Sequence, residues 1–265
     1  MILQILISFL VLLLIFRFLF LGRTSARFKI SITNFNNKHP EPLIIQKEKA
    51  SLIVVMNPVG DRRIGEAACR IAGEIITKHS QTEIANPIEF LKKACFLAHR
   101  GISEQMNANS GGCSIAIVYV SGKQLNYASV GDIGVYLFDD EIKQLNQFDL
   151  YKYQLRGQVL ERKISEERLL NNQLRNELTA YLGHENLKKV HLSNLPIQLL
   201  RSNKLLIATK DIYEVITPLT LESIILKRGK PVGKINLLEA TYQQLKQAKE
   251  KRPSTASAVI MSHFK

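Results

Sequence analysis

The sequence is poor in cysteine, and this shortage narrows the class of protein that it encodes. Its 265 residues contain 3 cysteines, Cys69, Cys95 and Cys113, which stand in apolar segments without paired spacing. We therefore expect buried thiols in a reducing compartment, and neither a disulfide framework nor a cysteine metal site. Internal repeats and low-complexity tracts are absent from the sequence as well. One globular domain with a terminal appendage is the simplest organisation for this length.

Acidic residues are also scarce, and the chain is strongly basic. There are 36 Lys and Arg against 23 Asp and Glu, which gives a formal net charge of +13. Such a surface favours phospholipid headgroups, nucleic acid or an acidic protein as partner. Gly111 and Gly112 lack a preceding strand and a phosphate-loop lysine, so nucleotide binding is not expected. Metal-ligand spacing is missing among the histidines, which we expect at the surface or at helix ends: His39, His79, His99, His184, His191 and His263.

The first 22 residues are almost wholly apolar, interrupted by Gln4, Ser8 and Arg17. At about 1.5 Å per residue, a helix of this length crosses a hydrocarbon core of about 30 Å. Positive charge follows the apolar run instead of preceding it, which favours an uncleaved anchor over a cleaved signal peptide. The same charge places the globular part on the cytoplasmic face of the membrane. We predict a single-pass anchor at 1–22, a basic juxtamembrane linker at 23–30 and one domain at 31–265.

The remaining sequence alternates strand patterns with helical patterns. Strands are predicted at 27–33, 43–46, 51–56, 113–120, 124–130, 134–138, 204–209 and 256–262. The three at 113–120, 124–130 and 134–138 are predicted to form a β-meander. Helices are predicted at 64–79, 87–103, 153–182, 221–226 and 237–250. Strand clusters that alternate with helix pairs indicate an α/β or α+β sandwich.

One stretch organises the rest of the chain. Residues 54–66 read VVMNPVGDRRIGE, in which an apolar strand ends at Asn57-Pro58, turns through Gly60-Asp61 and opens a helix. A turn between a buried strand and a helix can position side chains for chemistry.

Several segments, in order, resemble the bacterial metal-dependent serine/threonine protein phosphatases, the PPM or type 2C family. Residues 54–66 resemble the family's VVADGMGGHxxGE, and 111–137 resemble its GTT strand and VGDSRAYL segment. Residues 164–183 resemble the helix that ends in RNxLTRALG, 205–215 resemble LLLCSDGLYDV, and 254–260 resemble DNASxVI. The resemblance covers nearly the whole chain after residue 22. It implies an α+β fold, a four-layer α/β/β/α sandwich, with the metal site at one end of two central sheets.

The family binds two magnesium or manganese ions through aspartates, and those aspartates are missing here. The resemblance puts Asn57 and Pro58 where the family has Asp-Gly, Lys210 at the Asp of SDG, and Ser254 at the Asp of the final DN. Hard divalent cations prefer several carboxylate oxygens. A fixed ammonium at Lys210 repels such a cation by roughly a few kcal/mol at an effective dielectric near 20. We therefore expect a degenerate metal site and no cofactor.

Some residues leave alternatives open. Asp211 takes the place of the SDG aspartate if the alignment slips by one residue, and Glu41 and Asp61 are replacement ligands on the same view. The simpler interpretation of Asp61 is a cap of the turn before the helix. Arg62 and Arg63 stand where the family has a histidine; with Lys210 they form a candidate site for a phosphate or an acidic segment.

The leading functional prediction is a pseudophosphatase, a membrane-anchored and catalytically inactive relative of the PPM phosphatases. Such a chain acts as a binding or scaffold subunit, with other protein subunits and an anionic lipid surface as partners and no role for nucleic acid. Two alternatives remain. One is an active phosphatase that uses magnesium or manganese at an atypical site, and the other is a phosphopeptide-binding module.

Overall fold

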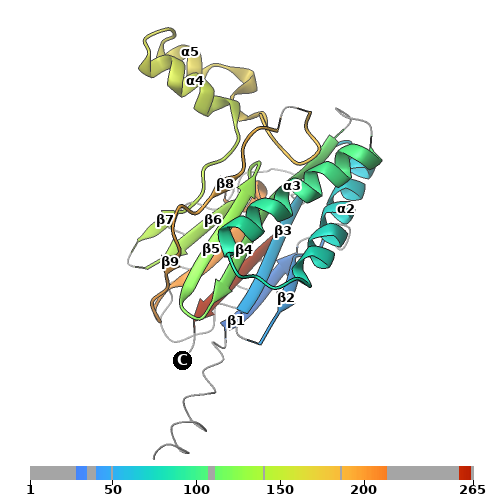
Figure 1. Cartoon of the computed structure of the whole chain (residues 1–265). Coiled ribbons are helices and arrows are strands. Elements are labelled where there is room, and N and C mark those ends of the chain that lie inside the picture. Colours follow the sequence, from blue (N-terminus) through green and yellow to red (C-terminus); the bar gives the residue numbers. More distant parts are fainter. Residues whose placement is uncertain are drawn as a thin grey trace, which may run out of the picture.

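A computed structural model describes residues 28–34, 40–48, 50–106, 111–139, 141–185, 187–213 and 257–263 (Figure 1). Within these residues the chain forms two antiparallel sheets, and helices cover the outer face of one of them. The predicted anchor at 1–22, the helices predicted at 221–226 and 237–250, and Ser254 lie outside the described residues. No helix in the described part is long and apolar enough to cross a membrane.

The larger sheet is six-stranded, and its main path follows the order β2-β3-β4-β5-β8. Its strands are β2 (Leu43–Gln46), β3 (Ala50–Gly60), β4 (Gly111–Ser121), β5 (Gln124–Val130), β8 (His191–Leu192) and β9 (Ile197–Gln198), which pairs with β5. β3 and β4 pair along their whole lengths, from Ala50 opposite Ser121 to Gly60 opposite Gly111. This long pairing places the end of β3 beside the beginning of β4.

The smaller sheet is five-stranded, in the order β1-β11-β10-β6-β7. Its strands are β1 (Phe28–Asn34), β11 (Ser257–His263), β10 (Lys204–Ala208), β6 (Gly134–Phe138) and β7 (Ile142–Gln144). The two ends of the described chain lie next to each other, because β1 pairs with β11 from Phe28 opposite His263 to Asn34 opposite Ser257.

The core follows the alternation of side chains along β3. Leu52, Val54 and Met56 belong to the cluster shared with the helices, and Ile53 and Val55 belong to the cluster between the sheets. Successive residues of a strand point to opposite faces, so a strand that is apolar at every position is buried on both. The sequence 51–56 therefore specifies a central strand, and it extends to Gly60.

Two helices cover the outer face of the six-stranded sheet, α2 (Arg62–Ser80) and α3 (Pro87–Gln105) (Figure 1). Asn86 caps α3 through its side chain, with Pro87 in the first turn, a strong helix-start signal. One stripe of each helix is buried against the sheet. Both helices extend the predicted ranges by one or two residues at an end, within the usual uncertainty of helix boundaries.

The predicted meander is wrong at its third strand. β4 and β5 form an antiparallel pair, but β6 pairs with β10 and β7 in the other sheet. The turn at Gly131-Asp132 and the fully buried Ile133 carry the chain from one sheet to the other. Strand spacing alone does not distinguish a hairpin from such a crossing.

The predicted helix at 153–182 is also wrong. This segment contains α4 (Tyr151–Leu160), α5 (Glu166–Leu170) and the 3-10 helix η1 (Gln173–Asn176). α4 buries Leu155, and α5 and η1 have no buried residue. The segment therefore lacks the continuous apolar face that would hold a long helix against the core. Ser165 caps α5, because its side chain accepts a hydrogen bond from the Arg168 amide at 3.2 Å.

Candidate functional site

The stretch at 54–66 forms the strand–turn–helix junction that the sequence predicts. β3 stays buried through Met56, becomes half-buried at Asn57 and Pro58, and reaches the surface at Gly60, whose φ is 83°. A positive φ of this size favours glycine. Asp61 then caps α2, because its carboxylate accepts a hydrogen bond from the Arg63 amide at 3.0 Å. The simpler of the two interpretations of Asp61 is thus the one that the structure shows.

Gly65 fixes how closely α2 approaches β3. A Cβ atom at this position would meet Pro58 Cβ at 2.7 Å and the backbone nitrogen of Val59 at 2.9 Å. The first turn of α2 therefore packs directly on the end of β3. The glycine of the family-like motif is retained here for packing.

Asn57 and Pro58 are both part of the sheet at this junction. In the register of β3 and β4, Asn57 lies opposite Ser114 and Pro58 lies opposite Cys113. Both β3 residues are half-buried. The position of the family's Asp-Gly therefore presents a neutral amide and a proline ring, without a carboxylate.

Lys210 begins α6 (Lys210–Tyr213), directly after β10. Its Nζ donates a hydrogen bond to the backbone carbonyl of Asn176 at 3.3 Å, which connects it to η1. Thr209, one residue earlier, is fully buried, and its hydroxyl accepts a hydrogen bond from the Ser257 amide at 3.1 Å. The backbone directly before Lys210 is therefore fixed by burial and by this hydrogen bond to β11.

Asp211 lies in α6 rather than on a strand. The side chain of Asp211 and the whole of Ser254 lie outside the described part. Whether Asp211 joins Glu41 and Asp61 as a ligand stays a prediction.

The two arginines of the candidate phosphate site are exposed at the start of α2. The Nε of Arg62 donates to Glu66 Oε1 at 2.8 Å, an i,i+4 ion pair on the surface of the helix. Arg63 contributes its backbone amide to the Asp61 cap. The two guanidinium groups therefore differ in their partners, because that of Arg62 is already paired with the Glu66 carboxylate.

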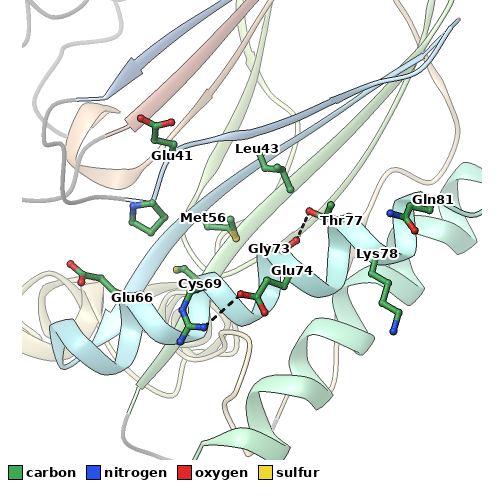
Figure 2. Close-up of a pocket in the computed structure, with 12 residues that line it drawn as sticks. Glu41, Leu43, Met56, Glu66, Cys69, Gly73, Glu74, Thr77, Lys78 and Gln81 are labelled. Atoms are coloured by element: carbon green, nitrogen blue, oxygen red, sulfur yellow. Dashed lines mark hydrogen bonds and ion pairs between the residues drawn. The ribbon is translucent and has the colours of Figure 1, made fainter.

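A groove of about 680 Å³ lies between α2 and the edge of the six-stranded sheet (Figure 2). Its apolar lining includes Leu43 of β2, Met56 of β3 and Cys69 of α2, and its carboxylates are Glu41, Glu66 and Glu74. Glu74 pairs with Arg70 at 3.6 Å. The structure therefore places Glu41 at this groove, together with Glu66, while Asp61 is used as the cap of α2.

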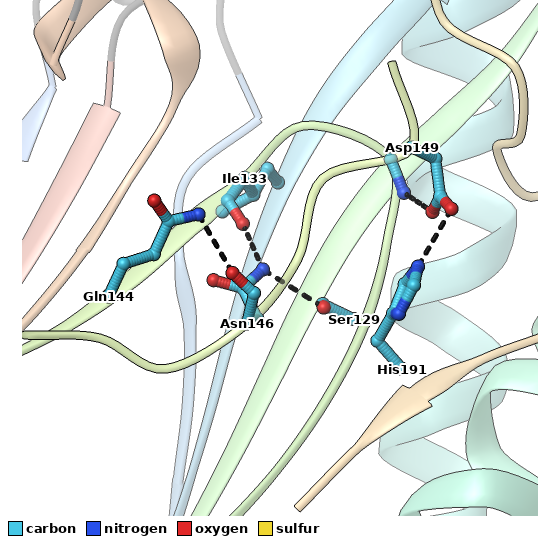
Figure 3. Close-up of polar contacts among 7 residues, drawn as sticks. Ser129, Ile133, Gln144, Asn146, Asp149 and His191 are labelled. Carbon is cyan, nitrogen blue, oxygen red and sulfur yellow. Dashed lines mark hydrogen bonds and ion pairs between the residues drawn. The ribbon is translucent and has the colours of Figure 1, made fainter. Parts of the chain in front are cut away.

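A buried polar network that sequence reasoning missed holds the turn between β5 and β6 (Figure 3). Asp149 accepts a hydrogen bond from the Gly131 amide at 2.8 Å, and its other oxygen lies 2.8 Å from His191 Nε2. The His191 side chain is 12% exposed, so its predicted place at the surface is wrong. No spacing signal links residues 42 positions apart, and only the return of β8 to the sheet brings them together.

Asn146 completes this network. Its amide nitrogen donates to Ser129 Oγ at 3.0 Å and to the Ile133 carbonyl at 2.8 Å, and its oxygen accepts from the Val135 amide at 2.8 Å. The phenol of Tyr213 donates to the Asp132 carbonyl at 2.7 Å. These contacts fix the crossing between the sheets, and the Gly131-Asp132 turn is structural in this respect.

The junction at 54–66 presents no carboxylate at Asn57 or at Pro58. Asn57 offers a neutral amide oxygen and Pro58 a backbone carbonyl, while Lys210 stands at the start of α6. In the part of the chain that the structure describes, no three His, Cys, Asp or Glu side chains are grouped closely enough to hold a metal ion.

Two packed antiparallel sheets with a helix pair on the outer face form the PPM phosphatase fold, and comparison with solved structures gives the same assignment. A serine/threonine phosphatase of S. agalactiae matches with a TM-score of 0.71 at 16% identity, over 90% of this chain and 100% of that one. The serine/threonine phosphatase PstP/Ppp of Mycobacterium tuberculosis matches with a TM-score of 0.67 at 15% identity, over 90% and 99%. PppA, a key regulatory component of T6SS in Pseudomonas aeruginosa, matches with a TM-score of 0.66 at 11% identity, over 91% and 99%. Identities this low establish the fold alone.

Sequence comparisons identify no relative. No protein-family profile matches the chain, and no curated protein matches it.

The expectation that the chain needs no cofactor is contradicted by these neighbours. A second structure of the PstP catalytic domain, with a TM-score of 0.65 at 15% identity, is a complex with 2 manganese ions. The prediction rested on the missing aspartates. Their absence removes one set of possible ligands, but it does not show that a chain of this fold binds no metal. Metal binding therefore belongs to every test of function.

Proposed function

We propose that this chain is a PPM-fold protein that acts by binding a partner at a membrane, and not by hydrolysing phosphoesters. The observation that carries the proposal is the chemistry of the junction. An amide, a proline and an ammonium occupy the positions at which the resembling family places ligands for its catalytic metals, while the packing around them is intact.

The state of Lys210 supports this view. Its ammonium donates to the Asn176 carbonyl, so the residue has a structural contact that an aspartate could not make. A carboxylate and a carbonyl both accept hydrogen bonds, so an aspartate at this position would find no donor in the Asn176 carbonyl. The substitution therefore replaces a metal ligand of the family by a connection between α6 and η1.

Anchoring at the cytoplasmic membrane is part of the proposal. It is supported by the apolar run at 1–22, by the basic residues that follow it, and by the net charge of +13, which favours anionic lipid or an acidic protein subunit. The similar structure of PppA is that of a regulatory component, which agrees with a role exerted through a partner.

A hydrolysis assay tests the inactive state. The full chain, purified in detergent, is given p-nitrophenyl phosphate and a phosphothreonine peptide with manganese, and metal binding is measured in parallel by calorimetry. We expect no turnover above the protein-free rate. Manganese-dependent turnover that Asp211→Ala removes and Glu141→Ala retains would establish the active alternative instead, since Glu141 is an exposed carboxylate on the turn before β7.

The same protein decides the phosphopeptide alternative. Binding of the phosphothreonine peptide without metal, lost in Lys210→Ala and in Arg63→Ala but kept in Lys143→Ala, would favour a phosphopeptide-binding module. Lys143 is an exposed lysine of β7 and serves as the matched control. We expect equal and weak binding in all of these variants.

Anchoring is tested separately by fractionation. Membranes from cells that express the full chain are washed with alkaline carbonate, which removes peripheral proteins. We expect the intact chain to stay in the pellet until detergent is added. Recovery in the wash, or an intact mass that lacks the first residues, contradicts the anchor.

A further inference from the structure

Two of the three cysteines touch each other inside the protein. Cys69 lies on α2 and Cys113 on β4, and their Sγ atoms are 3.1 Å apart. Both residues are free and fully buried. The Sγ of Cys113 also lies 3.2 Å from the Ser114 carbonyl, so Cys69 donates to Cys113, which donates to the carbonyl. This chain of contacts holds the two sulfur atoms side by side.

The packing of α2 on the sheet creates this contact. Cys69 and Cys113 belong to the same apolar cluster, which also contains the third cysteine, Cys95 of α3. Cys113 is held at the end of the sheet by its pairing with Pro58 and by two backbone hydrogen bonds with Leu182, at 3.0 and 2.9 Å. The backbones that carry the two sulfur atoms are therefore both fixed by the packing of α2 on the sheet.

The groove beside α2 provides an approach to this pair. Cys69 is one of the residues that line it, next to Met56, whose flexible side chain forms part of its apolar lining (Figure 2). Cys69 is fully buried, so a small peroxide reaches its sulfur from this groove only when a lining side chain moves.

We propose that Cys69 and Cys113 are a redox modification site, at which a peroxide converts the two thiols into one intramolecular disulfide. The Cys69 sulfur attacks one peroxide oxygen, the O–O bond breaks, and a sulfenic acid and one water form. The Cys113 sulfur then attacks the Cys69 sulfur and displaces the second water. Two S–H bonds and the O–O bond are broken, one S–S bond and two O–H bonds form, and the two thiol protons end in the two waters. The sulfurs are oxidised and the peroxide is reduced.

Closure of this disulfide joins two parts of the junction. It would link the first half of α2 covalently to the β4 residue that lies opposite Pro58. The oxidised chain is then constrained next to the position at which the resembling family binds metal. In a reducing compartment such a bond is transient and reports oxidative conditions.

Burial sets the rate of the reaction. It raises the pKa of the Cys69 thiol well above its ordinary value, and the contact with Cys113 raises it further. The thiolate is the reacting form, so little of it exists at neutral pH. We therefore expect a slow reaction that accelerates about tenfold for each unit of pH between 7 and 9.

Peptide mapping of the oxidised protein tests the site. The full chain in detergent is treated with hydrogen peroxide, remaining thiols are alkylated under denaturing conditions, and the digest is analysed by mass spectrometry. We expect a cross-linked peptide that joins Cys69 to Cys113, in wild type and in Cys95→Ser, and none in Cys69→Ser or Cys113→Ala. Cys95 is the matched control, since it is fully buried in the same cluster and burial raises the pKa of its thiol to about 12.

Thermal unfolding gives a second measurement that does not depend on the variants. A disulfide across 44 positions restricts the unfolded chain, so oxidation should raise Tm on the order of 10 °C, reversibly with dithiothreitol. Cross-links that involve Cys95 as often as Cys113, a protein that gains oxygen atoms without any cross-link, or an unchanged Tm would each overturn the proposal.

Discussion

The ammonium of Lys210 donates a hydrogen bond to the carbonyl of Asn176 across 34 positions of the chain, at 3.3 Å. Lys210 begins α6 and Asn176 ends η1, so this contact connects the core to the excursion formed by α4, α5 and η1. In Figure 1, α4 and α5 stand away from the two sheets. Few contacts hold them to the two sheets, so the loss of a single contact should have a measurable effect on their local stability.

We expect Lys210→Met to loosen η1 without unfolding the protein. The contact is exposed, so the free energy of unfolding should change by less than about 1 kcal/mol. Hydrogen exchange of the amides at 173–177 should become roughly fivefold faster, since local stability falls by a similar amount. Lys143→Met is the control, and faster exchange throughout the sheets would contradict a local role.

Gly65→Ala should be strongly destabilising, because the new methyl group would meet the backbone of Val59 and the ring of Pro58. We expect a loss of about 1–3 kcal/mol in the free energy of unfolding, as for other overpacked positions. Gly157→Ala is the matched control, since a Cβ there meets nothing and the residue lies within α4. It should be stabilising by about 0.5–1 kcal/mol, and urea unfolding of both variants measures the difference.

The pair formed by Asp149 and His191 should be energetically coupled. Asp149→Ala and His191→Ala each remove one partner of a largely buried contact, and we expect each to cost about 1–3 kcal/mol of stability. The double variant should lose less than the sum, because the contact is already absent in either single variant. Additive losses in urea unfolding would show that the two residues act separately. Asp139→Asn, at an exposed carboxylate, should stay within about 0.5 kcal/mol of wild type.

Acid should destabilise the protein in part through His99. Burial lowers the pKa of His99 below its ordinary value of 6.5, and neighbouring His184 lowers it further. The unfolded chain therefore binds a proton at this side chain more readily than the folded chain does. The stability that neutral His99 contributes is complete above pH 6.5, and it is lost as the pH falls through the lowered pKa of the folded state.

A variant isolates this effect. The Nδ1 of His99 accepts a hydrogen bond from the Gly183 amide at 3.1 Å, and a glutamine oxygen offers an acceptor that does not titrate. His99→Gln should lose less stability than wild type between pH 7 and pH 5, measured by urea unfolding at each pH. Lys188→Gln, at an exposed lysine, should follow wild type, and a His99→Gln curve parallel to wild type contradicts the prediction.

Much of the fold was predictable because its strands are apolar and short. The ranges at 43–46, 124–130 and 134–138 coincide with β2, β5 and β6. The sheet to which β6 belongs was not predictable, since its pairing with β10 is made across some seventy positions of the chain. The prediction of one helix at 153–182 failed for a related reason. The charged sequence suits a helix, but α4 buries Leu155 and neither α5 nor η1 has a buried residue, so no continuous apolar face sustains a long helix.

The junction shows where sequence reasoning about the site succeeds and where it ends. The strand, the turn and the cap at Asp61 follow from local signals, and the structure has all three. The contact of Lys210 with Asn176, the pair of Asp149 with His191 and the approach of Cys69 to Cys113 join residues between 34 and 44 positions apart. Only the folded topology specifies such pairs, and no spacing rule reveals them.

The place of β11 between β1 and β10 has a consequence for how the protein is made. Residues 35–256 separate β1 from β11 in the sequence. β11 is the neighbour of β1 in the sheet, so β1 can pair only after all of those residues have been synthesised. Until β11 is in place, β10 also has an open edge, and unpaired strand edges invite association with other chains.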